Sequence, residues 1–179
     1  MADSEARFVA VYEEFYPDVY AYCRRRLGSD VTDDVVADTF LTAWRRIEDL
    51  PPGPEALLWL YQVAYRSIGH QWRSVSRRKK LETKMNSFGH HIAPPTEDFV
   101  IQTGEARQIL QAASRLKPTD YEVLRLASWE QLSHAEIGHV LGITTDAVTQ
   151  RLYRARKAIT KEINRIQSPS PAAPKGGVS

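Results

Sequence analysis

Residues 133–159 read SHAEIGHVLGITTDAVTQRLYRARKAI, and this stretch decides how the C-terminal half of the chain folds. Ser133 and Glu136 have the spacing of a capping box, which predicts that a helix starts here. Gly142 fits the left-handed position that ends a short helix, and Thr144 or Thr145 can cap the next helix. A short helix, a glycine turn and a longer helix with a polar face form the pattern of a DNA-reading helix-turn-helix.

The longer helix of this pattern has two contrasting faces. Its apolar residues recur at helical spacing and are expected to face inward: Val148, Leu152, Ala155 and Ile159. The side chains predicted to read the major groove are Thr145, Asp146, Thr149, Gln150, Tyr153, Arg154 and Lys157. The amide of Gln150 can form two hydrogen bonds with one base edge, and the guanidinium of Arg154 can reach guanine or a phosphate. An ordinary helical hairpin with a solvated basic face is the alternative interpretation.

The segments on either side of the helix-turn-helix divide the chain. An apolar stripe predicts a helix over 106–116, and Pro118 is well placed in the first turn of the next helix. Residues 83–98, TKMNSFGHHIAPPTED, have neither a helical nor an alternating period, which predicts a flexible linker and a domain boundary. The last residues, SPSPAAPKGGVS, have low complexity and are expected to be disordered.

Three amphipathic helices are predicted in the N-terminal part. Their apolar stripes indicate helices from Phe8 to about Leu27, from Asp33 to about Ile47, and from Glu55 onward. Phe40 and Trp44 are expected to pack in the core. Trp72 shares a stripe with Leu60, Ala64 and Ile68, which favours core packing, with contact to a DNA base as the alternative. The fold class is therefore all-α, with two small helical domains joined by a linker. The predicted boundaries are 1–82 and 105–167 for the domains, 83–104 for the linker and 168–179 for the tail.

Composition narrows the class of protein. The net charge of the 179 residues is only +2, so any DNA contact must come from local basic patches. Cys23 is the only cysteine, which excludes an internal disulfide and suits a reducing cytosol. No apolar run is long enough to span a bilayer, so we expect a cytoplasmic protein without membrane insertion. Because phosphate loops, nucleophile motifs and metal-spaced clusters are absent from the sequence, we predict no enzymatic activity, cofactor or metal.

Three motifs together resemble those of extracytoplasmic-function sigma factors, members of the sigma-70 family. DDVVADTFLTAWRRI at 33–47 is similar to the family's region 2 helix, and WLYQVAYR at 59–66 is similar to the start of its promoter-melting helix. AEIGHVLGITTDAVTQRLYRAR at 135–156 is similar to its region 4 reader. The resemblance implies a subunit that binds core RNA polymerase and directs it to promoters. The resemblance assigns residues 1–82 to region 2 and residues 105–167 to region 4. Region 4 would read the -35 element.

The resemblance also assigns roles within region 2. Contact with the clamp helices of the polymerase's largest subunit is implied for Asp34, Asp38, Leu41 and Arg45. Recognition and melting of the -10 element is implied for Tyr61, Gln62, Tyr65, Arg66, His70, Arg73, Arg77 and Arg78. A flipped base needs an aromatic platform and polar groups at its edge, and the side chains near Tyr65 are expected to lie on or beside the exposed side of their helix. Further implied partners are the flap of the second-largest subunit, promoter DNA and an anti-sigma factor.

The -10 sequence and the class of regulator are both left open by the residues alone. Tyr65 and Arg66 stand where the family commonly has Arg-Asn, and His70 stands where it commonly has Asp, so the -10 sequence is not predicted. The main alternative function is a stand-alone helix-turn-helix regulator that binds operators without polymerase. An interaction module such as an anti-sigma protein is disfavoured by the basic run from Arg73 to Lys80 together with the reader helix.

Overall fold

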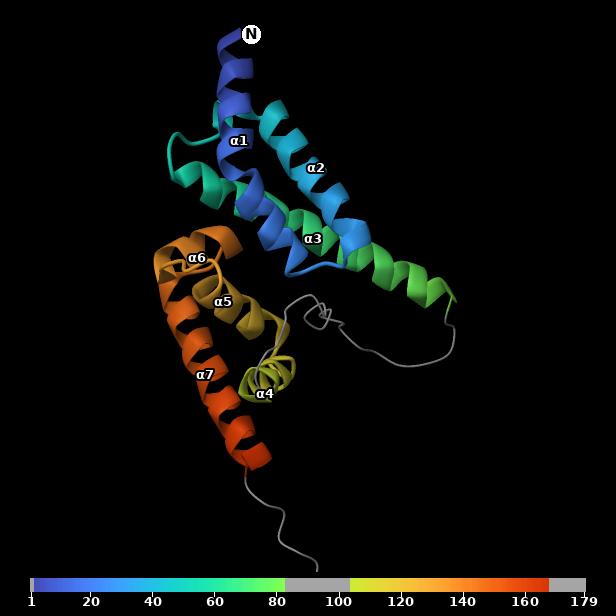
Figure 1. Cartoon of the computed structure of the whole chain (residues 1–179), viewed down its shortest axis with the longest axis vertical. Helices are drawn as coiled ribbons and strands as arrows, with labels where there is room; N and C mark the ends of the chain where they lie inside the picture. Colours follow the sequence, from blue (N-terminus) through green and yellow to red (C-terminus); the bar gives the residue numbers. More distant parts are fainter. Residues whose placement is uncertain (1, 83–103, 168–179) are drawn as a thin grey trace, which may run out of the picture.

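The structure is a computed structural model that describes residues 2–82 and 104–167, and these residues form helices and no strand. The predicted all-α fold class is confirmed. Figure 1 shows a three-helix N-terminal unit above a four-helix C-terminal unit. The predicted linker and tail lie outside the described residues, except for Gly104, which starts a helix.

The N-terminal unit contains α1 (Ala2–Arg24), α2 (Ser29–Arg45) and α3 (Glu55–Glu82), with a short 3-10 helix, η1, at Ile47–Asp49. Each of the three long helices packs against the other two. Their apolar stripes meet in a core whose members include Val19, Tyr22, Val35, Leu60, Ala64 and Ile68. Residues 50–54, LPPGP, separate η1 from α3, and α3 starts at the predicted residue.

Two details of the N-terminal unit differ from the sequence prediction. Helix α2 begins at Ser29 with Gly28 as its N-cap, so the predicted start at Asp33 is wrong and Asp30 is the acidic residue of the first turn. Trp44 was expected in the core, but 43% of its surface is exposed and its ring contacts Phe8 edge-on at 5.2 Å. It lies at the edge of the buried stripe, where a large ring covers apolar surface without being enclosed.

The C-terminal unit contains α4 (Gly104–Ala113), α5 (Pro118–Ser128), α6 (His134–Leu141) and α7 (Thr145–Gln167). Helix α7 packs against α4, α5 and α6, and Pro118 occupies the first turn of α5 as predicted. The shared core contains Val123, Leu126, Ile137, Val140, Val148 and Leu152.

The turn between α6 and α7 has the predicted chemistry. Ser133 and Glu136 form a reciprocal capping box, and Gly142 ends α6 with φ of 66°. The Thr144 hydroxyl accepts a hydrogen bond from the amide of Ala147 at 3.2 Å. A Cβ at Gly138 would lie 2.8 Å from the carbonyl oxygen of Ile143, so glycine lets the turn cross α6 closely. The helix-turn-helix is therefore fixed by local caps and one close approach.

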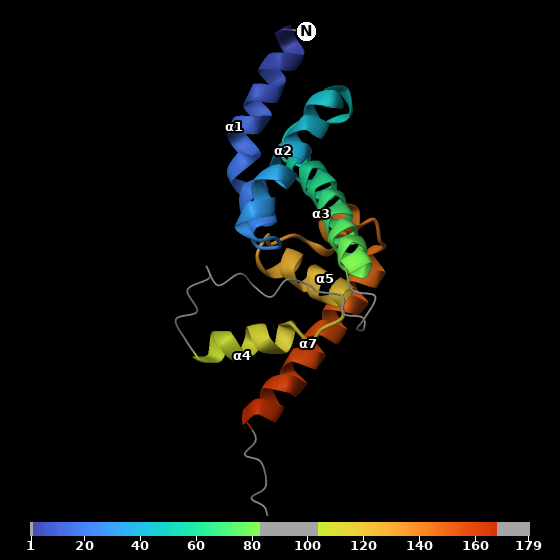
Figure 2. The ribbon, with the colours of Figure 1, turned by 90° about the vertical axis from the view of Figure 1, so that its right-hand side faces the viewer.

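The two units are in contact within the described residues. Helix α3 packs against α6, and Figures 1 and 2 both show the C-terminal unit lying under α3. A buried arginine at the end of α1 also reaches residues of the C-terminal unit. This contact determines which of the candidate site residues face solvent.

Candidate DNA-binding surfaces

Helix α7 presents the predicted reader face to solvent. Val148, Leu152 and Ala155 are buried, as expected, whereas Ile159 is only partly buried. All seven predicted readers are exposed: Thr145, Asp146, Thr149, Gln150, Tyr153, Arg154 and Lys157. Tyr153 is among the exposed large apolar side chains, with 66% of its surface accessible. The geometry of a major-groove reader is therefore present, although base contacts stay a prediction.

Neighbouring side chains hold parts of this reader face in position. His134 Nδ1 and Thr149 Oγ1 lie 2.9 Å apart, which links the first turn of α6 to α7. Arg154 donates two hydrogen bonds to the carboxylate of Asp120, whose own surface is 5% exposed. Asp120 was not among the predicted site residues, because in the sequence an acidic residue in the first turn of a helix is already explained by the helix dipole.

Helix α3 carries the candidates for the -10 element. Arg66, His70 and Arg73 are exposed, and Gln62 and Tyr65 are partly buried. Arg77 and Arg78 belong to α3, but their side chains lie outside the part of the chain that the structure describes.

Tyr61 does not lie on the exposed side of α3, so that expectation is wrong. Only 4% of its surface is accessible, and its ring stacks on that of Tyr22 with centroids 4.7 Å apart. Burial raises the pKa of its hydroxyl, and Glu130 and Asp18 add to the effect. Tyr61 follows Leu60 of the buried stripe, and its ring packs on Tyr22 of α1 instead of facing solvent.

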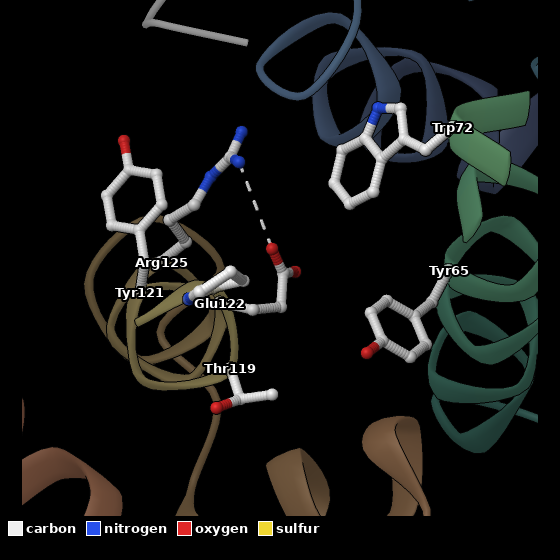
Figure 3. A pocket seen from close by; sticks show the side chains of 7 residues that line it. Tyr65, Trp72, Thr119, Tyr121, Glu122 and Arg125 are labelled. Atoms are coloured by element: carbon white, nitrogen blue, oxygen red, sulfur yellow. Dashed lines mark ion pairs between the residues drawn. The ribbon is translucent and has the colours of Figure 1, made fainter. Parts of the chain in front are cut away.

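Partly buried residues of α3 face the C-terminal unit. The Gln62 amide donates a hydrogen bond to the carbonyl oxygen of His139 at 2.9 Å. Figure 3 shows Tyr65 and Trp72 on one side of a pocket and α5 on the other. The side chains of α5 that line it include Thr119, Tyr121, Glu122 and Arg125. Trp72 also packs against the core, in agreement with the interpretation of its stripe.

The candidates for polymerase contact lie along the exposed side of α2. Asp34, Asp38, Leu41 and Arg45 follow one another at helical spacing and are all exposed. Leu41 and Trp44 add apolar surface, with 43% of each accessible. Sequence reasoning missed Trp44 here, because a tryptophan on an amphipathic helix is more often a core residue.

The described residues carry no group of three or more possible metal ligands of the His, Cys, Asp or Glu type. Among the helices of residues 2–82 and 104–167, none is both long and apolar enough to cross a membrane. The fold and its exposed faces define an all-helical protein with a C-terminal helix-turn-helix of the DNA-binding class.

Comparison with known families gives the particular family. The Sigma-70 region 2 family matches residues 11–78, and the Sigma-70, region 4 family matches residues 106–159. These matches cover the two structural units in the expected order, on either side of the predicted linker. The chain belongs to the sigma-70 family of RNA polymerase sigma factors, in its extracytoplasmic-function group.

Individual relatives agree with this assignment. The chain is 28% identical over 156 residues to the ECF RNA polymerase sigma factor BldN of Streptomyces coelicolor, covering 86% of this chain and 59% of BldN. It is 30% identical over 135 residues to the RNA polymerase sigma factor NccH of Alcaligenes xylosoxydans xylosoxydans. This match covers 74% of this chain and 72% of NccH. The fold is similar to that of the sigma factor RpoE, solved in complex with the anti-sigma factor NepR from Bartonella quintana. That match has a TM-score of 0.63 and 19% identity, and covers 94% of this chain and 100% of RpoE.

Proposed function

We propose that this protein binds core RNA polymerase and directs it to promoters that carry particular -35 and -10 elements. The observation that carries the proposal is the presence, in one chain, of a region 2 unit and a region 4 helix-turn-helix that exposes all seven predicted readers. Such a protein is an initiation factor, and we propose that it catalyses no reaction itself. Its place of action would be the cytoplasm, where the polymerase works.

The C-terminal unit is proposed to read the -35 element. Helix α7 would enter the major groove with the amide of Gln150 and the guanidinium of Arg154 directed at base edges or phosphates. Arg154 is pre-oriented for this task, because Asp120 holds its Nε and Nη2 and leaves other N–H groups available for DNA.

The N-terminal unit is proposed to bind the -10 element and the polymerase on different faces. Tyr65 on α3 would stack on a flipped base, with Gln62, Arg66 and His70 near its edge and the basic end of α3 on phosphates. The exposed side of α2 would dock on the clamp helices of the largest subunit. Region 4 would contact the flap of the second-largest subunit, and an anti-sigma factor is a further proposed partner.

The predicted boundaries of region 2 at 1–82 and region 4 at 105–167 are retained as proposals. Two linked sites raise each other's effective concentration, so neither unit needs to bind DNA tightly alone. The stand-alone regulator is not favoured, because the N-terminal unit matches sigma region 2.

Affinity for core polymerase tests the docking part of the proposal. Fluorescently labelled protein would be titrated with core polymerase, and Leu41→Ala and Arg45→Ala should each weaken binding about tenfold, because both side chains lie on the proposed docking face. Arg165→Ala on α7 is the matched control, since that arginine is exposed and pairs with Glu162 of its own helix. Unchanged affinity in both α2 variants would contradict docking through this face.

A further inference from the structure

Arg26 is a charged side chain enclosed between the two structural units. It follows the C-terminal end of α1, and its side chain is 0% exposed. Its Nε donates a hydrogen bond to Glu122 of α5 at 2.8 Å, and its Nη1 donates to Glu130 at 3.0 Å. Arg25 donates to the same Glu130 carboxylate at 2.7 Å. Two arginines of the N-terminal unit are thus paired with two glutamates of the C-terminal unit.

We call Arg25, Arg26, Glu122 and Glu130 the interdomain ion cluster. Burial lowers the pKa of Arg26, but Glu122, Tyr22 and Glu130 outweigh it, so the pKa lies above its ordinary value. Burial raises the pKa of Glu130, but Arg26 and Arg25 outweigh it, so that pKa lies below its ordinary value. Both groups are charged at neutral pH and stabilise each other only while the units stay together.

Aromatic rings and backbone contacts extend the cluster. The Arg26 guanidinium lies 3.6 Å from the centroid of the Tyr22 ring, which in turn stacks on Tyr61 of α3. Arg125 of α5 donates a hydrogen bond to the carbonyl oxygen of Arg25. A buried charge without its partner is strongly unfavourable, so this contact favours two states, fully paired or separated and hydrated.

The same contact covers part of the face of α3 that the proposed function assigns to the -10 element, at Gln62 and Tyr65, while Arg66 and His70 stay exposed. Gln62 is bonded to His139 of α6, and Tyr65 faces α5 across the pocket in Figure 3. Tyr61 on the same helix is buried against Tyr22 of α1. Tyr121 and Glu122 form the wall opposite Tyr65, on the side where a flipped base would have to stack.

We propose that the interdomain ion cluster is an autoinhibitory latch that holds the C-terminal unit over the -10 face of α3, and that the latch must open before promoter melting. The occupant of this face in the free protein is the chain's own C-terminal unit. That the latch inhibits promoter melting rests on the proposed function of α3. That the two units are held together in the free protein does not depend on that function.

The closed state can be tested on the full chain without polymerase or DNA. Spin labels would be placed on two exposed positions, through Glu14→Cys on α1 and Lys161→Cys on α7, and the distance between them measured by pulsed EPR. The latch predicts one dominant distance in the parent protein. In Glu130→Gln, a second distance should grow from about 10% or less to the larger part of the population, because Arg25 and Arg26 lose their shared carboxylate. Glu13→Gln, an exposed substitution on α1, is the matched control and should leave the distribution unchanged.

A distribution in Glu130→Gln that superimposes on the parent would overturn the proposal. If circular dichroism shows that Glu130→Gln is unfolded, Arg25→Ala replaces it. This change removes one ion pair to Glu130 and leaves Arg26 paired with both glutamates, so a smaller shift toward the second distance is expected. Promoter melting with core polymerase then tests the inhibitory role, and opened variants should melt faster than the parent. A shift in distance without faster melting would overturn autoinhibition, whereas absence of initiation in every variant would count against the proposed function instead.

Discussion

Arg154 of α7 donates two hydrogen bonds to Asp120 of α5, from Nε to Oδ2 over 3.2 Å and from Nη2 to Oδ1 over 3.0 Å. The carboxylate is nearly enclosed, whereas 53% of the arginine side chain is exposed. The hydrogen bonds and the charge of Asp120 raise the pKa of Arg154. A bidentate pair fixes the plane of the guanidinium before it meets DNA, which favours binding by reducing the loss of side-chain freedom.

We therefore predict that Asp120→Asn weakens -35 recognition. Asp120 would act by orienting Arg154 and not by contacting DNA itself. The amide keeps the size of the side chain but cannot accept both charged hydrogen bonds. Affinity of the polymerase complex for its promoter should fall about fivefold, equivalent to about 1 kcal/mol. Filter binding on promoters with intact and scrambled -35 elements measures the effect, and Asp30→Asn on α2 serves as the control. Loss of affinity that is equal on both promoters would show that Asp120 does not act through -35 recognition.

Any side chain introduced at Gly138 should lower the free energy of unfolding. A Cβ at this position would meet the Ile143 carbonyl oxygen at 2.8 Å, so Gly138→Ala forces the turn away from α6. We expect the free energy of unfolding to fall by about 1 to 3 kcal/mol in urea titrations followed by circular dichroism. Gly69→Ala on α3 is the matched control, because its Cβ would meet only the end of the Arg73 side chain at 3.8 Å. That variant should be unchanged or more stable by up to about 1 kcal/mol, since alanine favours helix. Equal effects of the two substitutions would contradict the close approach.

Cys23 should not react with thiol reagents in the folded protein. Its side chain is buried, and burial raises the pKa of the thiol to about 12, with Arg26 and Arg25 opposing the effect. Because the thiolate is the reactive form, a disulfide reagent at pH 8 should label this cysteine only after the protein is unfolded. Labelling in increasing urea should follow the loss of helix measured by circular dichroism. Rapid stoichiometric labelling without denaturant would contradict the burial of this residue.

Glu130 gives the stability of the protein a defined pH dependence. Its pKa lies below the ordinary value of 4.5, so its stabilising contribution is complete above that value and is lost as the pH falls through the lowered pKa. The groups that interact with it are Arg25, Arg26, Tyr22, Tyr61 and Arg125. Glu130→Gln should therefore be less stable than the parent at pH 7, by about 2 to 4 kcal/mol.

The difference between Glu130→Gln and the parent should shrink as the pH falls below 4.5 and through the lowered pKa of Glu130. Urea unfolding at a series of pH values from neutral to acidic measures it. Glu13→Gln, on the exposed side of α1, should show no comparable loss at pH 7. A difference that stays constant over the whole range would mean that the charge of Glu130 does not stabilise the folded chain.

The helix-turn-helix could be predicted closely from the sequence because its boundaries are set by local chemistry. The capping box at Ser133, the left-handed glycine at Gly142 and the proline at the start of α5 each act within a few residues. The start of α2 was predicted too late, because Gly28 caps that helix without a side-chain hydrogen bond and so leaves little signal in the sequence. Trp44 and Tyr61 lie at the edges of apolar stripes, where the helical period alone does not decide burial.

The contacts between the two units could not be predicted in this way. Arg26 and Glu122 are separated by 96 positions, and Arg25 and Glu130 by 105. In the sequence each of these side chains is explained equally well as a solvated charge or as part of a helix terminus. Their pairing depends on how the two units pack, and this information has no local period. The candidate site residues could be named, but the neighbours that orient and cover them could not.

Transcription with purified core polymerase tests the central claim most directly. Core polymerase alone and with the added protein would be offered a library of promoter fragments, and the run-off transcripts would be sequenced. We predict transcripts that require the protein and start downstream of shared, regularly spaced -35 and -10 elements; Arg154→Ala should reduce them by about tenfold or more, whereas Arg165→Ala should not. Promoter binding in the absence of core polymerase, with no protein-dependent transcripts in its presence, would contradict the account and favour a stand-alone regulator.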